Sequence, residues 1–163
     1  MSTSLKELMN FIPQKGKVEW IGLRPAKWAE LSAVNAIEID VEEGLKEDHY
    51  SGKSRKRQVT LILKEHLEAV AKLLGKETID PQLTRRNIVV SGINLTALKQ
   101  KQFQIGEVIL ETTGDCHPCS RMEENLGPGG YNAMRGHGGI TAKVIQGGQV
   151  KLGDEVVLLV QKG

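Results

Sequence analysis

Short segments of alternating apolar and polar residues, separated by glycine-rich turns, make up most of this sequence. Alternation with a period of two is typical of strands that bury one face. Eighteen glycines indicate many turns, and only two Phe and two Trp leave a core of Val, Ile and Leu. We therefore expect a mostly β chain with seven or so strands. The segments concerned are 17–23, 36–41, 57–63, 87–93, 103–111, which a glycine interrupts, and the alternating segments after residue 138.

Helical patterns are few. The clearest covers 64–74, where apolar residues recur at helical spacing before Gly75, and a weaker amphipathic pattern begins after a capping serine at 4. Strands and helices do not alternate strictly, so a partly closed β-barrel with peripheral short helices is favoured over a doubly wound sheet. We expect one domain over 1–163, with a helical extension at about 1–15.

Composition limits the classes of function. A formal net charge of +2 is too small to indicate nucleic-acid binding, although the basic run at 53–57 suits either a phosphate site or a solvated loop. No apolar stretch approaches the roughly 18 residues of a membrane span, and residues 1–11 lack the features of a signal peptide. We expect a cytoplasmic protein that binds neither membrane nor nucleic acid.

Cys116 and Cys119 are the chemical centre of the sequence, because they are its only cysteines and lie three residues apart. A thiolate is both a nucleophile and a soft metal ligand. The pair follows an expected strand and precedes an expected helix, whose N-terminus favours the thiolate form of Cys119. Three other interpretations stay open: a zinc site with ligands from elsewhere, a thioredoxin-like redox pair, and two inert thiols.

Polar residues elsewhere supply further candidates. Arg85, Arg86 and Asn87 precede an expected strand, where they can bind an oxyanion or simply form a solvated helix end. Asp48 and His49 lie in a long polar loop, as a general base, a metal ligand or a simple turn. The glycine-rich segments near 127 and 138 match neither a P-loop nor a dinucleotide fingerprint.

Taken in order, these motifs resemble the MOSC family, the domain that ends the molybdenum-cofactor sulfurases and also occurs alone in bacteria. The resemblance covers roughly 20–160. It rests on Gly44-Leu-x-x-Asp48-His49, Arg57-Gln-Val-Thr-Leu-Ile, Arg85-Arg86-Asn87-Ile-Val-Val-Ser-Gly, Phe103-x-Ile-Gly, Cys116-x-x-Cys119, Gly138-Gly-Ile and Val150-x-x-Gly-Asp154.

The resemblance implies a β-barrel similar to that of pyruvate kinase, with a reactive cysteine at Cys119. In the amidoxime-reducing members a matching cysteine ligates the molybdenum of a molybdopterin, and similar bacterial members reduce N-hydroxylated purines. The candidates to hold the cofactor, and above all its pterin phosphate, are then Arg85, Arg86 and Asn87, with Arg57 and Lys53 as further cations and Asp48 and His49 from the first motif.

The resemblance also implies a second role, in which Cys119 carries sulfur as a persulfide for cofactor or metal–sulfur cluster assembly. The chain has no room for a desulfurase domain, so pyridoxal phosphate would belong to a separate cysteine desulfurase. An oxidoreductase would likewise need an electron-transfer partner, because no flavin, haem or iron–sulfur pattern is visible. A thiolate suits both roles, and the sequence does not choose between them.

Overall fold

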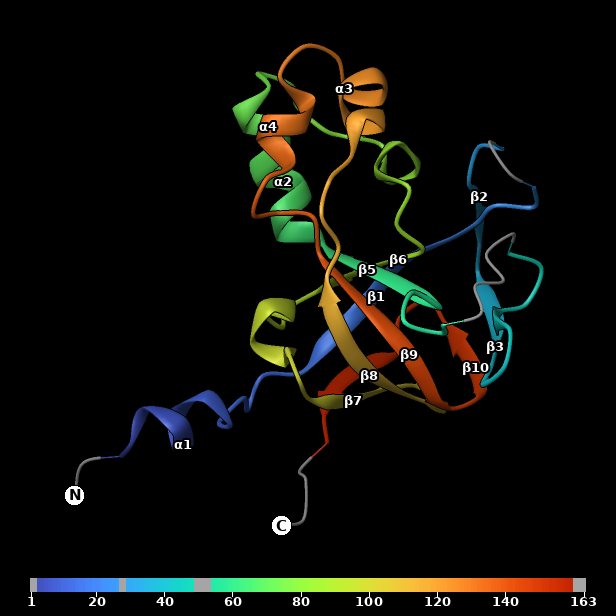
Figure 1. Ribbon diagram of the computed structural model, residues 1–163, viewed down its shortest axis with the longest axis vertical. Helices are drawn as coiled ribbons and strands as arrows, with labels where there is room; N and C mark the ends of the chain where they lie inside the picture. The colour runs from blue at the N-terminus through green and yellow to red at the C-terminus, as the bar shows by residue number, and fades with distance from the viewer. Residues whose placement is uncertain (1–2, 27–28, 49–53, 160–163) are drawn as a thin grey trace.

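A closed β-barrel forms the centre of the computed structural model, which describes residues 3–26, 29–48 and 54–159 (Figure 1). The described strands run around it in the order β11–β7–β8–β9–β5–β6–β1, and pairing of β11 with β1 completes the closure that the sequence predicts only in part. All these neighbours are antiparallel except β5 and β6, which are parallel. The barrel strands are β1 (Gly16–Leu23), β5 (Val59–Leu63), β6 (Ile88–Ser91), β7 (Gln102–Ile105), β8 (Val108–Asp115), β9 (Ile140–Gln146) and β11 (Glu155–Leu158).

The barrel interior is the main hydrophobic core. Inward-facing side chains such as Leu61, Ile88 and Leu110 are fully buried there, and Phe103 is the aromatic residue among them. Burying such aliphatic side chains contributes about 1.5–3 kcal/mol each. The alternation seen in the sequence is thus the inward and outward alternation of the barrel wall.

A second core lies outside the barrel, where helices cover β5 and β6. Strand β5 is buried on both faces, because Leu61 points into the barrel and Ile62 points toward these helices. Figure 1 shows the helices gathered at one end of the molecule. They are α2 (Lys64–Leu73), α3 (Ser120–Leu126) and α4 (Gly130–Met134), with the 3₁₀ turn η1 (Pro81–Thr84) beside α3.

A small sheet covers another part of the barrel. It has the order β10–β3–β4, and Ile37, Ile39 and Val150 from it join the main core. These strands are β3 (Ala36–Asp40), β4 (Gly44–Leu45) and β10 (Gly148–Lys151). Strand β2 (Ser32–Val34) pairs antiparallel with the end of β1, and the 3₁₀ turn η2 (Leu95–Leu98) precedes β7.

The N-terminal helix α1 (Leu5–Met9) stands away from the barrel (Figure 1). The hydroxyl of Ser4 accepts a hydrogen bond from the amide of Glu7 at 3.1 Å, so Ser4 caps the helix as predicted. None of its side chains is buried. No described helix is long and apolar enough to cross a membrane.

Three parts of the fold differ from the sequence prediction. The expected strand at 103–111 is a hairpin of β7 and β8, because Gly106 adopts φ +56° and turns the chain. The short strands β2 and β4 carry too few residues to show a period. Helix α4 lies in the glycine-rich segment near 127, where no helix was expected. Gly130 allows close packing there, because a Cβ atom at this position would lie 2.6 Å from the carbonyl oxygen of Met122.

Candidate functional site

The cysteine loop, residues 116–119, connects the end of β8 to the start of α3. Its first residue is bound to the segment just before β9, since the amide of Cys116 donates to the carbonyl of Gly139 at 2.9 Å. Cys116 is only 2% exposed, whereas Cys119 is exposed. Cys119 is also the N-cap residue of α3, yet its side chain makes no capping hydrogen bond. The Cys119 thiol is therefore accessible and not used to begin the helix.

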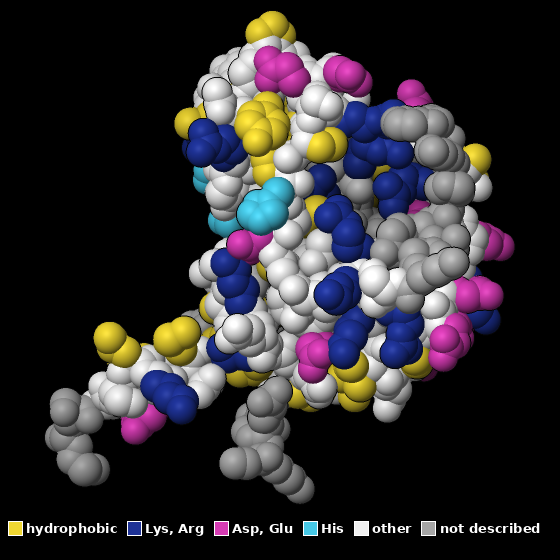
Figure 2. Space-filling model, viewed as in Figure 1, with side chains coloured by type: hydrophobic (Ala, Val, Ile, Leu, Met, Phe, Trp, Pro, Cys, Tyr) yellow, Lys and Arg dark blue, Asp and Glu magenta, His cyan; other side chains and the backbone are white. Residues whose placement is uncertain are grey.

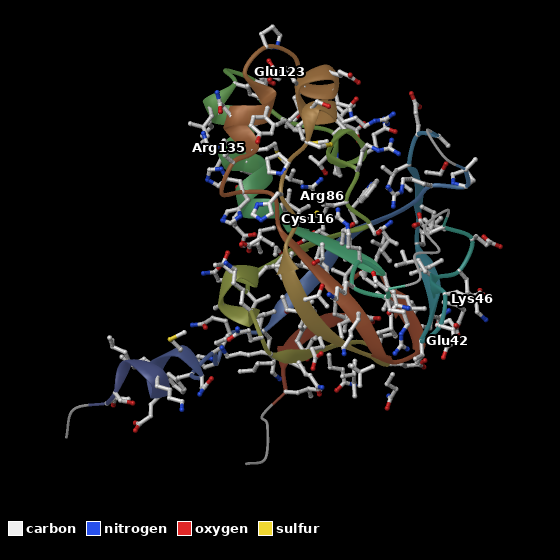
Figure 3. The ribbon with its side chains drawn as sticks, viewed as in Figure 1. Glu42, Lys46, Arg86, Cys116, Glu123 and Arg135 are labelled. Atoms are coloured by element: carbon white, nitrogen blue, oxygen red, sulfur yellow. The ribbon has the colours of Figure 1, made fainter. Side chains whose placement is uncertain are left out.

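Arg86 holds the cysteine loop in place through hydrogen bonds to its backbone. The residue is 5% exposed, and its guanidinium donates to the carbonyl of Gly138 at 2.9 Å, that of Thr84 at 2.8 Å and that of Cys116 at 2.8 Å. A longer bond of 3.5 Å reaches the carbonyl of His117. Figure 3 shows Arg86 and Cys116 side by side where β8 leaves the barrel. Most donors of the Arg86 guanidinium therefore hold the backbone of the cysteine loop and of the segments next to it.

Glycine at 138 is what lets this arrangement form. A Cβ atom at Gly138 would lie 2.1 Å from the carbonyl oxygen of Cys116 and 3.1 Å from a guanidinium nitrogen of Arg86. The segment before β9 therefore approaches the cysteine loop more closely than any side chain would permit. This is the close backbone approach that a glycine-rich segment indicates.

Five arginines lie close enough to act electrostatically on one another or on the two thiols. This arginine cluster consists of Arg24, Arg57, Arg85, Arg86 and Arg121. Burial lowers the pKa of the Arg85 guanidinium, and the charges of Arg121 and Arg24 lower it further. The charges of Cys119 and Asp48 act in the opposite direction. Figure 2 shows Lys and Arg side chains gathered on the face between α3 and the barrel. Crowded like charges of this kind favour an anion as a ligand.

Both thiols act on Arg86. Burial lowers the pKa of the Arg86 guanidinium; the charges of Cys116 and Cys119 raise this pKa, whereas the charge of Arg57 lowers it. Arg57 reaches the buried thiol directly, because its Nη2 donates to Sγ of Cys116 at 3.8 Å. Both cysteines therefore face the same positively charged surroundings.

Strand register explains why residues so far apart in sequence meet here. A single row of paired residues crosses five neighbouring strands: Ile21, Ile88, Leu61, Ile140 and Asp115. The cysteine loop and four of the arginines lie close to this row, at the ends of β1 and β8 and before β5 and β6, and Arg121 lies in α3. The site is thus built on the barrel wall and completed by α3.

The chain matches a known domain family over more than half of its length. The model of the MOSC domain matches residues 46–157, which is more than half of the chain and contains the cysteine loop. The chain belongs to the MOSC domain family. A search of curated proteins finds no match.

Solved structures agree with this MOSC fold. The chain is similar to the YuaD protein from Bacillus subtilis, with 21% identity and a TM-score of 0.79 over 93% of this chain and 100% of that one. It is also similar to YiiM from Escherichia coli (16% identity, TM-score 0.69, covering 90% of this chain and 71% of that one). YiiM from Geobacillus stearothermophilus gives 14% identity and a TM-score of 0.73, covering 89% and 75%. At these identities the likeness shows the fold.

Within this MOSC barrel, Asp48 contacts both Asn87 and Arg24. The Asp48 carboxylate accepts from the backbone amide of Arg24 at 2.8 Å and from its Nη2 at 3.5 Å. Asn87 donates to Asp48 at 3.4 Å and to the carbonyl of Gly22 at 3.1 Å, and its oxygen accepts from the Thr60 hydroxyl. These two residues orient Arg24, so any contribution to anion binding passes through that arginine. His49 and Lys53 lie outside the described residues.

Two members of the arginine cluster were missed by sequence reasoning. Arg121 follows Cys119 by two residues and lies in the first turn of α3, so its nearness to the thiol was a usable signal. Arg24 follows β1 with no motif around it, and only the pairing of β1 with β6 brings it to the site. Its Nε is buried with no hydrogen-bond partner among the described residues, which leaves a donor for a ligand.

No three His, Cys, Asp or Glu side chains of the described chain come together as a metal site. A pocket of about 190 Å³ does lie against the cysteine loop, lined by His66, Lys99, Asp115, Cys116 and His117 and by glycines before β9. His66 and His137 meet beside it with ring centroids 5.2 Å apart. A metal ion at Cys119 would therefore take its other ligands from the molecule that carries it.

Proposed function

We propose that this MOSC protein binds a molybdenum cofactor, with Cys119 as the protein's ligand to the metal, and reduces small N-hydroxylated substrates in the cytoplasm. The observation that carries the proposal is an exposed thiol, unused in helix capping, within the charge field of Arg85 and Arg86. A thiolate is a suitable soft ligand, and guanidinium groups suit the phosphate of a pterin.

The donor set of the site fits such a group. Arg24 has a buried Nε without a partner among the described residues, and the exposed Arg57 has donors beyond its one contact with Cys116. The half-buried Arg85 donates to the carbonyl of Ala29 through one nitrogen, and its other donors make no further hydrogen bond to the described residues. These three arginines are the proposed phosphate ligands. Arg86 is assigned the positioning of the loop in place of direct binding, because its donors already serve carbonyl groups.

In this proposal the chain binds and orients, and the bound cofactor supplies the two-electron redox chemistry. Arg86 fixes the backbone of the loop so that Cys119 is held at one place above the barrel. Asp48 and Asn87 fix Arg24 in the same manner. The electrons come from a separate electron-transfer protein, since the sequence carries no second redox group.

A second function is also supported by a specific observation. Cys119 is exposed, so the sulfur of a partner protein can reach it directly. A cysteine desulfurase, holding its own pyridoxal phosphate, would then load Cys119 with a persulfide for cofactor or metal–sulfur cluster assembly. The MOSC protein would have no independent turnover in this role.

Metal analysis of the purified protein tests the proposal. Protein from a host that makes molybdopterin should contain molybdenum near one atom per chain, the Cys119→Ser variant should contain none above background, and the Cys116→Ser variant should keep it. Because the cofactor can dissociate on purification, a wild-type protein without molybdenum is then incubated with released cofactor. Failure to bind it at that stage overturns the cofactor role.

The same preparations distinguish the carrier function. Incubation with a desulfurase and cysteine should add the mass of one sulfur atom to the wild-type chain, removable by a reductant, and should leave Cys119→Ser unchanged. Molybdenum bound without this mass gain supports the oxidoreductase. The mass gain without molybdenum supports the carrier.

A further inference from the structure

A second pocket lies at the edge of the core outside the barrel, and the proposed function does not use it. This pocket, which we call the Trp20 pocket, has a volume of about 280 Å³ and lies between β1, the first half of α2 and the segment that leads to η1. Its apolar wall consists of Trp20, Leu67, Ile79, Pro81 and Val89. Neither a cysteine nor a member of the arginine cluster is among its described lining residues. The Trp20 pocket is therefore separate from the candidate site.

An irregularity in β1 turns Trp20 toward this pocket. Regular strand alternation would place Trp20 on the same side as Val18, inside the barrel. The pairing of β1 with β6 shifts by one residue between these two positions, so Val18 and Ile21 face the barrel interior, while Trp20 packs against the core outside it. Bulges of this kind re-aim side chains and are common beside binding sites. Gly22 leaves room for the indole, because a Cβ atom there would lie 2.1 Å from Cη2 of Trp20.

Carboxylates outnumber cations around the Trp20 pocket. Glu19, Glu68 and Glu77 line it with a single lysine, Lys64, so three carboxylates against one ammonium leave a formal excess of two negative charges. The carboxylate of Glu19 accepts from the Ser91 hydroxyl at 2.8 Å, and the other two glutamates are exposed. Within the described part of the chain, none of the three carboxylates forms an ion pair. Their charge is therefore available to a ligand.

We propose that the Trp20 pocket binds a small organic cation with an apolar body, such as an aromatic or alkyl amine. The apolar wall buries the body of the ligand, and the π system of Trp20 attracts its positive charge. The carboxylates replace the water that the cation loses on entering. Ligand pockets commonly measure about 300–1,000 Å³, so a pocket of this volume suits a small ligand.

The other classes of small ligand use this pocket less well. A neutral apolar molecule would contact the wall but gain nothing from the carboxylates, and an anion would be repelled by them. Binding of an organic cation goes beyond the proposed function, because it requires neither molybdenum nor sulfur transfer and takes place away from Cys119.

Tryptophan fluorescence tests the proposal on the full chain without cofactor. Trp28→Phe leaves Trp20 as the only tryptophan. Benzyltrimethylammonium, a cation that carries a phenyl ring, should change the emission of Trp20 in a saturable manner, in the low millimolar range or below. Benzyl alcohol, which keeps the ring but lacks the charge, should bind at least about fivefold more weakly. Titration calorimetry on the unsubstituted chain makes the same comparison without Trp28→Phe.

A matched set of carboxylate variants shows whether the charge is read at this pocket. Glu68→Gln combined with Glu77→Gln should weaken binding of the cation about fivefold, and both side chains are exposed, so folding should not change. Glu124→Gln, at an exposed carboxylate of α3 that does not line the pocket, should leave binding unchanged.

Absence of saturable binding, equal affinity for the charged and neutral probes, or equal effects of the pocket and control variants would each overturn the proposal. These measurements use no molybdenum and leave Cys119 intact. A negative result would therefore leave the proposed function standing, and a failure of the molybdenum measurement would not affect the Trp20 pocket.

Discussion

Arg85 and Arg86 are neighbours in sequence with opposite surroundings. The Arg86 side chain is buried and donates to carbonyls of three separate segments, while Arg85 is half-buried and adopts a left-handed backbone conformation with φ +60°. A non-glycine residue in that conformation costs about 1–2 kcal/mol. Strain of this kind at a site is commonly retained for function. In the proposed function Arg86 is therefore a positioning residue, and Arg85 is the arginine proposed to bind the phosphate.

Replacing Arg86 with Met should destabilise the protein by about 3 kcal/mol, because buried carbonyls of Thr84, Cys116 and Gly138 lose their donor. Urea unfolding measures this change. Arg135→Met, at an exposed arginine, should cost less than about 0.5 kcal/mol. Equal stability of the two variants would show that Arg86 does not hold the loop.

Arg85→Gly provides the contrasting change. It relieves the left-handed backbone and removes one contact to Ala29, so stability should move by less than about 1 kcal/mol. Binding of inorganic phosphate, followed by calorimetry, should nevertheless weaken. Gln100→Gly shares the backbone relief, with φ +60° at an exposed position outside the arginine cluster, and should leave phosphate binding unchanged.

At the scale of elements, helices α2 and α4 are joined by two histidines beside the site. His66 lies on α2, and His137 follows α4 with its Nδ1 at 3.0 Å from the carbonyl oxygen of Ala133. Burial lowers the pKa of His66 below its ordinary 6.5, the nearby His137 lowers it further, and Glu65 acts in the opposite direction. Protonation of His66 therefore opposes the packing of the helices.

The sign of the resulting pH dependence follows from that lowered pKa. The unfolded chain binds a proton at His66 before the folded one does, so stability is complete above the unfolded value and falls as pH decreases toward the folded value. His66→Gln should reduce the loss of stability measured between about pH 7.5 and about pH 5.5. The exposed His117→Gln is the control, and an equal pH dependence in both variants would contradict the assignment.

For the whole molecule, closure of the barrel depends on its last strand. Val156 of β11 is fully buried and pairs with Gly16 on one side and Ile105 on the other. Without β11, both β1 and β7 would present an open edge and the core would meet water. By contrast, α1 buries no side chain and lies away from the barrel (Figure 1).

Truncations at the two ends should therefore differ sharply. Removal of residues 155–163 should abolish cooperative thermal unfolding and leave an aggregating chain, whereas removal of residues 1–10 should shift stability by less than about 0.5 kcal/mol. Calorimetry on the two truncated chains makes the comparison. A cooperative transition without β11 would mean that the barrel does not need closure.

The sequence by itself determined most of the barrel and singled out the cysteine pair as the candidate site. Alternation predicts the long strands because one face of each is buried, and helical spacing with a following glycine predicts α2 almost to the residue. The two cysteines stand out because thiols are chemically distinct. Patterns of this kind are local, so they survive in a linear sequence.

Only the tertiary structure decided which residues face the thiols. Arg24 joins the site through the register of β1 against β6, and Arg86 turns out to serve buried carbonyls because β6 passes close to the cysteine loop. Cys116 was set beside Arg57 in the same manner. Strand register couples residues that no sequence spacing relates, and burial decides which donors are left for a ligand. The sequence therefore specifies the chemical groups, and the packing around them decides which can bind a ligand and which position other residues.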